Sequence, residues 1–258
     1  MKLAYSFATT LTLLVVSSAV ASTTGCAVDA DTNADDSTAE SELSASSNSG
    51  YFRVVRRDTR RCPSPTCGGL FVKRVNEAKT QCADGSRQAE CYVASVDLGG
   101  MGLSGRDDVE FREAFESGRA LIKAKTFKTT SPAGTFGVLK VQANEGWVAK
   151  TGATPASLDS ASFYRVADRG LRCKTAPCPS LTASGLNGAY DYNLVEVGFE
   201  SLGGADADTV AHARRALHTS QGVLVAGVVA LPKCAAGVLD CGPFLMPTEI
   251  FARVVPQD

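Results

Sequence analysis

One segment of this chain occurs twice, and the distance between the copies limits what the chain can fold into. Tyr51-Phe52-Arg53-Val54 returns as Phe163-Tyr164-Arg165-Val166, and each copy is followed by a cysteine pair, Cys62 with Cys67 and Cys173 with Cys178. The cysteine pairs lie 111 residues apart, which is long enough for each copy to bury its own core and too long for a solenoid unit. The sequence therefore predicts two similar tandem domains, over residues 51–155 and 156–258.

The first residues have the pattern of an export signal. Lys2 precedes an apolar run that ends in small residues. Two cleavage sites compete: an A-x-A motif at Ala19-Val20-Ala21, and Thr23-Thr24-Gly25-Cys26, which is typical of bacterial lipoproteins apart from its Thr23. The chain has nine cysteines, and setting Cys26 aside leaves an even number. We therefore expect a signal peptide over residues 1–25 and a lipid on Cys26 that anchors the protein to the outer membrane or cell surface, with secretion as a soluble protein as the alternative.

The residues after the signal differ in composition from the rest. Residues 26–50 contain six acids and no Lys or Arg, and are otherwise mostly Ser, Ala, Asn and Thr. Such a segment cannot bury enough apolar surface to offset the loss of chain entropy, so it predicts a disordered tether. With Lys2 and those acids set aside, residues 51–258 carry 25 Lys and Arg against 21 Asp and Glu, a formal charge of +4.

Both copies predict the same order of elements. In the first, strands are expected over residues 51–57, 69–75 and 92–98, then a helix from about Asp107, then strands over 120–128 and 136–147. In the second, strands are expected over 163–169, 189–197, 222–231 and 244–255, with a helix near 209–217. Three strands, a helix and two strands is the order of OB-like small barrels, and an open α+β sheet or a three-layered fold shares it. We expect a mainly β chain with some α (α+β), built of two OB-like barrels.

The cysteines predict disulfides rather than a metal site. Eight cysteines of an exported chain lie in close pairs, and local pairing needs the least rearrangement, so we expect the disulfides Cys62–Cys67, Cys82–Cys91, Cys173–Cys178 and Cys234–Cys241. No C-x2-C motif is present, and His212 and His218 are spaced for different faces of a helix. We therefore expect no metal.

The motifs that suggest catalysis are weak. Gly100, Gly102 and Gly105 form a G-x-G-x-x-G that follows an expected strand and opens an expected helix. The acid that would bind a ribose about 20 residues further on is absent. There is no G-x-S-x-G elbow, and the acids Asp107 and Asp108 suit the start of a helix. The sequence thus indicates no cofactor and no enzyme.

Basic residues near the start of the first copy suggest a binding surface. With Tyr51, Phe52 and Phe71 nearby, they could form a face that binds a glycan or another polyanion of the envelope. The alternative without a function in binding is a solvated strand face. We expect no specific nucleic acid, while a protein partner stays open. The candidate ligand-binding residues are Arg53, Arg56, Arg57, Arg60, Arg61, Lys73 and Arg74.

Two other classes of function compete with this one. The loop Cys62-Pro63-Ser64-Pro65-Thr66-Cys67, and the loop between Cys173 and Cys178, could present a rigid peptide to a protease as inhibitors do. An envelope enzyme with a site between the two domains is the third class.

Three stretches of the first copy carry a family resemblance. They are Cys62 to Gly69, Phe71-Val72-Lys73-Arg74-Val75-Asn76, and Glu90-Cys91-Tyr92-Val93-Ala94. With them the chain resembles an uncharacterised family of exported, myxobacterial-type lipoproteins that carry a domain of unknown function, most clearly over residues 51–105. The resemblance implies a setting in the cell envelope and brings no activity, substrate or catalytic residue.

The export and cysteine assignments can be checked by intact mass of the mature protein from membranes, with and without reduction. We expect a chain that begins at a diacylglyceryl-modified Cys26 and gains eight hydrogens on reduction, two for each expected disulfide. A lipid-free chain beginning at Ser22 would contradict the anchor.

Overall fold

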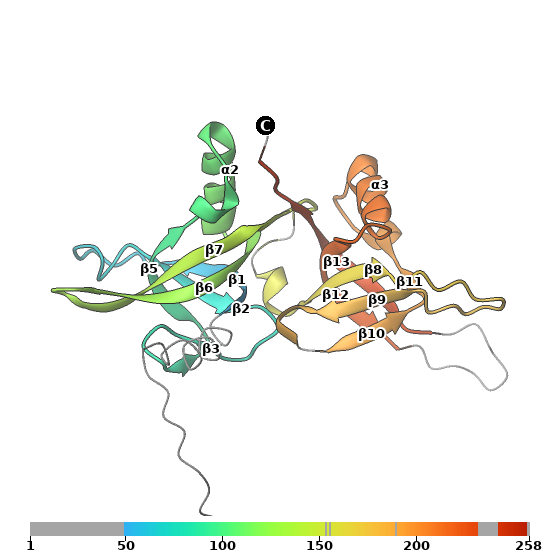
Figure 1. The fold of residues 1–258 in the computed structure, drawn as a ribbon, viewed down its shortest axis with the longest axis horizontal. Helices are drawn as coiled ribbons and strands as arrows, with labels where there is room; N and C mark the ends of the chain where they lie inside the picture. Colours follow the sequence, from blue (N-terminus) through green and yellow to red (C-terminus); the bar gives the residue numbers. More distant parts are fainter. Residues whose placement is uncertain (1–48, 153, 155, 189, 232–241, 257–258) are drawn as a thin grey trace, which may run out of the picture. The chain divides into compact units, whose positions relative to one another are not determined.

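The protein is mainly β, as expected. The structure is a computed structural model that describes residues 49–258 except 153, 155, 189, 232–241 and 257–258 (Figure 1). Its strands form one mixed sheet of eleven strands and one hairpin of two. The first copy contains β1 (Ser49–Arg57), β2 (Leu70–Arg74), the short pair β3 (Thr80–Gln81) and β4 (Arg87–Gln88), β5 (Cys91–Asp97), α2 (Gly105–Glu116), β6 (Ala120–Ser131) and β7 (Gly134–Ala149).

The second copy follows with a nearly identical order. It contains β8 (Ser162–Asp168), β9 (Leu181–Gly185), β10 (Asp191–Leu194), β11 (Glu196–Val197), α3 (Ala207–Ala216), β12 (Val223–Ala230) and β13 (Phe244–Arg253). The sequence did not predict β9. Its residues, Leu-Thr-Ala-Ser-Gly, lack the aromatic and β-branched run that marks a strand. Its pairing with both β8 and β10 therefore stabilises the extended conformation that its own β propensity does not favour.

In each copy the strand pairings form a ring. In the first copy β1 pairs with β2 and β6, β2 with β5, β5 runs parallel to β7, and β7 pairs with β6. In the second copy β8 pairs with β9 and β12, β9 with β10, β11 runs parallel to β13, and β13 pairs with β12. Only Val195 separates β10 from β11. The two copies therefore share one topology, with the helix at the same place in the order.

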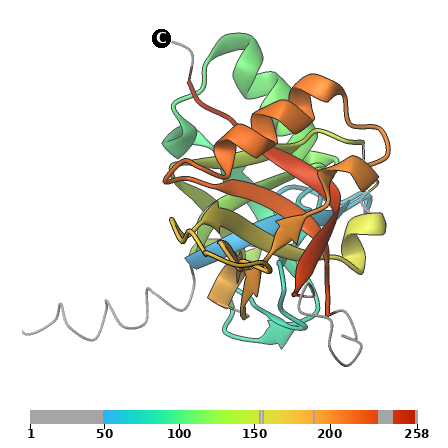
Figure 2. The same cartoon turned by 90° about the vertical axis from the view of Figure 1, so that its right-hand side faces the viewer.

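Each copy has an apolar core under its helix. Helix α2 buries Phe111, Ala114 and Phe115 in the first core, and α3 buries Ala213 in the second. The N-cap Asp206 of α3 accepts a hydrogen bond from the Thr209 amide at 2.6 Å. Figure 2, in which the second copy faces the viewer, shows α3 lying across β12 and β13.

A third apolar cluster is shared by the two copies. It brings Tyr51, Leu121 and Trp147 of the first copy against Phe163 and Phe251 of the second. Beside it β7 and β13 pair antiparallel, with Val148 opposite Ala252. Because these two residues hold corresponding positions in their strands, the two copies meet here in a nearly two-fold manner.

Two asparagines connect the copies in the same symmetric way. Asn187 Oδ1 accepts from the Tyr51 amide at 2.8 Å, and its Nδ2 donates to the Tyr51 and Val75 carbonyls at 3.1 and 2.8 Å. Asn76 Oδ1 accepts from the Phe163 amide at 2.8 Å, and its Nδ2 donates to the Phe163 and Leu186 carbonyls at 2.7 and 3.1 Å. Each carboxamide thus satisfies backbone groups of the other copy.

The backbone around these asparagines is shaped for the exchange. Asn76 and Asn187 have φ values of 60° and 62°, in the left-handed region that asparagine tolerates better than most residues. A Cβ on Gly50 would lie 2.6 Å from Asn187 Oδ1, so only glycine at that position allows the carboxamide to reach the Tyr51 amide.

Removing either carboxamide should destabilise the protein. We expect Asn76→Ala and Asn187→Ala each to lower the free energy of unfolding by about 2–4 kcal/mol, because backbone groups lose their partners and alanine is strained at positive φ. The Asn→Gly variants should lose less stability than the Asn→Ala variants, because glycine lacks the carboxamide but is not strained at positive φ. Urea unfolding measures both, with Asn193→Ala, an exposed β10 position, as a control expected within about 0.5 kcal/mol of wild type. Equal effects at all three positions would contradict the interpretation.

Tyr51 should make stability depend on alkaline pH. Its hydroxyl donates to Glu145 Oε2 at 3.0 Å and accepts from Arg165 of the other copy. Burial, and then the Glu145 charge, raise the pKa of Tyr51 from 10.0 to about 12, although Arg165 opposes the shift. The folded state keeps the proton that the unfolded state loses, so this contribution is complete below pH 10 and is lost as pH rises through about 12. Urea unfolding should show the stability advantage of wild type over Tyr51→Phe shrinking across that range; a constant difference would contradict it.

Candidate functional site

The structure separates the predicted basic residues. Arg53 is fully buried, and its guanidinium is paired with Asp159, which Lys73 also contacts at 2.9 Å. Burial lowers the pKa of Arg53, while Asp159 opposes that shift. Burial would raise the pKa of Asp159, but Lys73 and Arg53 outweigh it and hold that pKa below its ordinary value. Through Asp159, Arg53 and Lys73 therefore hold the segment that connects the two copies.

Other members of the predicted set also have acidic partners. Arg57 pairs with Glu116 of α2 at 2.6 Å, and Arg74 pairs with Glu77 at 3.1 Å. Arg61 is exposed, and no ion pair or hydrogen bond joins its side chain to another described residue. The set therefore does not form one continuous basic face.

Arg56 and Arg60 instead lie on a row of aromatic rings. Phe71 of β2 is 5.6 Å from Tyr92 of β5, and Tyr92 is 6.5 Å from Phe136 of β7, measured between ring centroids. The Arg56 guanidinium lies 3.5 Å from the centroid of Phe71, and that of Arg60 lies 5.8 Å from the centroid of Tyr92. The rings are half-buried and both arginines are exposed. We call these five residues the aromatic platform.

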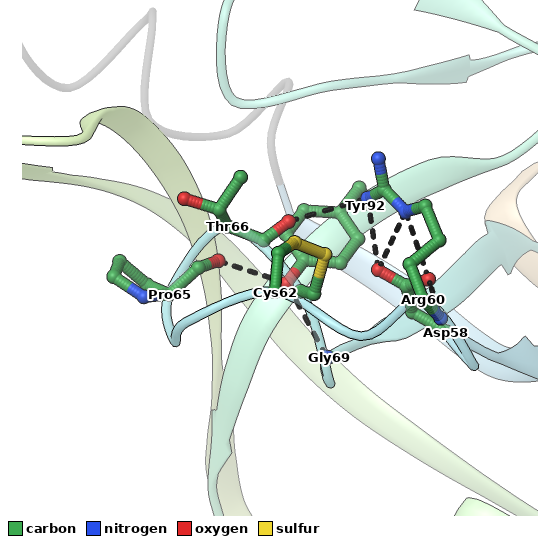
Figure 3. Close-up of a disulfide and its surroundings, with 8 residues drawn as sticks. Asp58, Arg60, Cys62, Pro65, Thr66, Gly69 and Tyr92 are labelled. Carbon is green, nitrogen blue, oxygen red and sulfur yellow. Dashed lines mark hydrogen bonds and ion pairs between the residues drawn. A yellow bond between two sulfur atoms is a disulfide. The ribbon is translucent and has the colours of Figure 1, made fainter.

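The first disulfide loop is fastened to this platform. The Tyr92 hydroxyl donates to the Pro65 carbonyl at 2.8 Å and accepts from the Gly69 amide at 3.3 Å (Figure 3). A Cβ on Gly69 would lie 2.2 Å from the Val93 carbonyl oxygen, so glycine is needed for this approach. The loop between Cys62 and Cys67 therefore lies at one end of the row of rings.

Arg60 is held in place by the same loop. Its guanidinium bonds both carboxylate oxygens of the buried Asp58, and it donates to the Thr66 carbonyl at 3.2 Å (Figure 3). The hydrogen bond from Arg60 lowers the pKa of Asp58. The ionised Asp58 binds the Arg60 guanidinium and thereby holds it beside the Tyr92 ring.

In the described part of the second copy, the positions that correspond to Phe71 and Tyr92 carry no aromatic ring. Strand pairing places Phe71 opposite Arg56 and Tyr92 in the first copy. In the second copy it places Thr182 opposite Ala167 and Asn193. Core positions are apolar in both copies, whereas these outward positions are aromatic and basic in only one.

Sequence reasoning found Arg56 and Arg60 but missed Tyr92 and Phe136. Strand alternation around Tyr92 was a usable signal, because Cys91 and Val93 on either side of it are buried. Phe136 could not be assigned in this way, since its position depends on the parallel pairing of β5 with β7.

The cysteine predictions are supported where the structure describes them. Cys62–Cys67, Cys82–Cys91 and Cys173–Cys178 are at disulfide distance, with Cα atoms 5.4, 5.3 and 5.5 Å apart. Cys234, Cys241 and Cys26 lie outside the described residues. The Thr66 amide donates to the Pro63 carbonyl at 3.0 Å, so the first loop is a closed turn. A peptide that adds to another protein's sheet does so as an extended strand, and this turn is not extended.

The structure also shows where the glycine motif lies and what the described residues offer to a metal or a membrane. Gly102 and Gly105, of the glycine motif, have φ values of 66° and 56° and turn the chain from a 3-10 segment into α2. The described residues contain no group of three or more His, Cys, Asp or Glu side chains arranged to hold a metal ion. Within the same residues, every helix is too short or too polar to cross a membrane.

Comparison with known proteins identifies a family. No curated protein and no solved structure matches the chain. The family model described as a domain of unknown function (DUF6748) matches residues 51–257, which include both copies of the repeat. The chain therefore belongs to the DUF6748 family, whose domain has no known function.

Proposed function

We propose that this protein is a non-catalytic binding module of the cell envelope whose aromatic platform binds an acidic glycan. The observation that carries the proposal is the pair of arginines held against a row of half-buried rings. Aromatic faces bind the apolar faces of sugar rings, and guanidinium groups bind carboxylate or sulfate groups in a planar, two-point manner. A glycan that carries acidic groups presents both features.

We infer further that each copy is an OB-like barrel. The ring of strand pairings supports this, as does the helix between the third and fourth strands of each ring. On OB folds the face of the second and third strands, with its flanking loops, binds oligosaccharides and oligonucleotides. The platform lies at that place in the first copy: β2 and β5 are the second and third strands, and the Cys62–Cys67 loop joins the first strand to the second.

The acidic partners of the two arginines do not prevent ligand binding. Arg56 pairs with Glu90 at the surface, with about half of its side chain exposed. Exposed pairs of this kind are worth about 0–1 kcal/mol, so an acidic ligand can replace Glu90 at little cost. Asp58 keeps Arg60 in position while 60% of the Arg60 side chain stays exposed.

Glycan is favoured over nucleic acid by the arrangement of the rings. Arg56 covers one face of Phe71, and the neighbouring rings meet edge to face. Single-stranded nucleic acids bind through open ring faces on which successive bases stack. The rings of Phe71, Tyr92 and Phe136 meet at 63° and 71°, so they do not present parallel faces to successive bases, whereas a sugar ring needs contact with one ring face only.

The expected export also belongs to the proposal. The signal-like start and Cys26 suggest a lipoprotein on the outer membrane or cell surface, and the resemblance of the first copy implies one of myxobacterial type. There an acidic tether would separate the platform from the membrane, and it would end before Ser49, because Ser49 and Gly50, which the sequence assigned to the tether, belong to β1.

Calorimetric titration of the mature chain with an oligosaccharide of uronic acids tests the platform. Phe71→Ala and Tyr92→Ala should each weaken binding about tenfold, and Arg56→Glu should weaken it further and reduce its salt dependence. A neutral glucan of equal length should bind wild type more weakly than the acidic one.

The chain provides matched controls for each change. Arg57→Glu alters the neighbouring arginine, which pairs with α2, and Thr182→Ala and Asn193→Ala alter the corresponding positions of the second copy. All three should bind as wild type does. Undiminished binding by Arg56→Glu, or stronger binding of a single-stranded oligonucleotide than of the glycan, would overturn the proposal.

A further inference from the structure

A cavity of about 650 Å³ lies between α3 and the ends of β7 and β13. Its wall is largely apolar and includes Trp147, Val223, Ile250, Phe251 and Ala216. Its volume is in the range of about 300–1,000 Å³ that small-molecule sites occupy. The cavity is on the helix side of the second copy and shares no lining residue with the aromatic platform.

The rim of this cavity is positively charged. Lys150, Arg215 and Arg253 line it, against the single carboxylate of Asp208. Among the described residues, no ion pair or hydrogen bond reaches the Lys150 ammonium or the Arg215 guanidinium. By contrast, the adjacent Arg214 does not line the cavity and pairs with Glu200. Two cations without partners therefore stand at the mouth of an apolar chamber.

The first copy has an apolar residue at the equivalent position of its own groove beside α2. The Val254 amide donates to the Gly146 carbonyl at 2.9 Å, and the Lys150 amide donates to the Ile250 carbonyl at 2.9 Å, so the two residues hold equivalent positions. Val254 packs on the core beside α2. In the second copy that position carries Lys150, an exposed residue whose charge cannot cover an apolar floor.

We propose that this cavity binds a single alkyl carboxylate, a fatty acid of medium chain length. The alkyl chain lies against Trp147, Ile250 and Phe251, and the carboxylate lies at Lys150 and Arg215. The groove beside α2 suits such a ligand less well, because the acids Asp107 and Glu110 on its wall offset the charges of Lys150 and Arg253.

The chain carries a direct reporter for this site. Trp147 is its only tryptophan, is 3% exposed and lines the cavity. Titration of the mature protein with decanoate below its micelle-forming concentration should change the intrinsic fluorescence saturably. Decanol and decyltrimethylammonium should bind at least about tenfold more weakly, since neither has an anionic group for the rim.

Variants separate the cavity from non-specific binding of alkyl chains. Lys150→Ala with Arg215→Ala should weaken decanoate binding about tenfold, whereas Arg214→Ala should leave it unchanged. Ala216→Phe should fill the cavity and abolish binding, with the circular dichroism of wild type showing that the fold is kept. Equal affinity for decanoate and decanol, or an undiminished signal in Ala216→Phe, would overturn the proposal.

Discussion

The reciprocal contact of Asn76 and Asn187 is the interaction on which the arrangement of the two copies depends. Each carboxamide makes three partly buried hydrogen bonds to backbone of the other copy, beside the apolar cluster that the two copies share. Buried backbone groups without partners are costly, so neither copy can move away from the other without exposing them or leaving them unsatisfied. The ladder of β7 with β13 and the ion pair of Arg53 with Asp159 add to a junction that these two residues define.

Much of the local structure could be predicted because it depends on short-range patterns. Alternation and turn residues located most strands, and acids followed by a spaced apolar face located both helices. The ring closures and the asparagine contacts could not, because the asparagine contacts join residues 87–136 positions apart and the ring closures also pair strands that are far apart in the sequence. The same limit applies to charge: Arg53 is in an alternating strand, but only the fold shows that its side of the strand is buried and that Asp159 is its partner. The predicted basic face failed to form as a whole because its counter-charges, Glu90, Glu116 and Asp159, come from distant parts of the chain.

Duplication explains why one chain can carry two different sites. The two copies keep the same ring of strands and equivalent core positions, so the outward positions are free to differ. Phe71 and Tyr92 correspond to Thr182 and Asn193, which gives the platform to the first copy alone. Val254 and Lys150 also correspond, and their difference gives the groove beside α2 an apolar side chain where the groove beside α3 has a cation. A single repeat unit could not meet both requirements with one set of residues.

The two sites should depend on the junction to different degrees. The platform is built within the first copy, from β2, β5, β7 and the loop that Tyr92 holds. The cavity takes Trp147 from β7, Lys150 from the residue after β7 and the rest of its wall from the second copy, so its shape requires the copies to stay in register. Weakening the asparagine contacts should therefore disturb the cavity before it disturbs the platform, because only the cavity has walls on both sides of the junction.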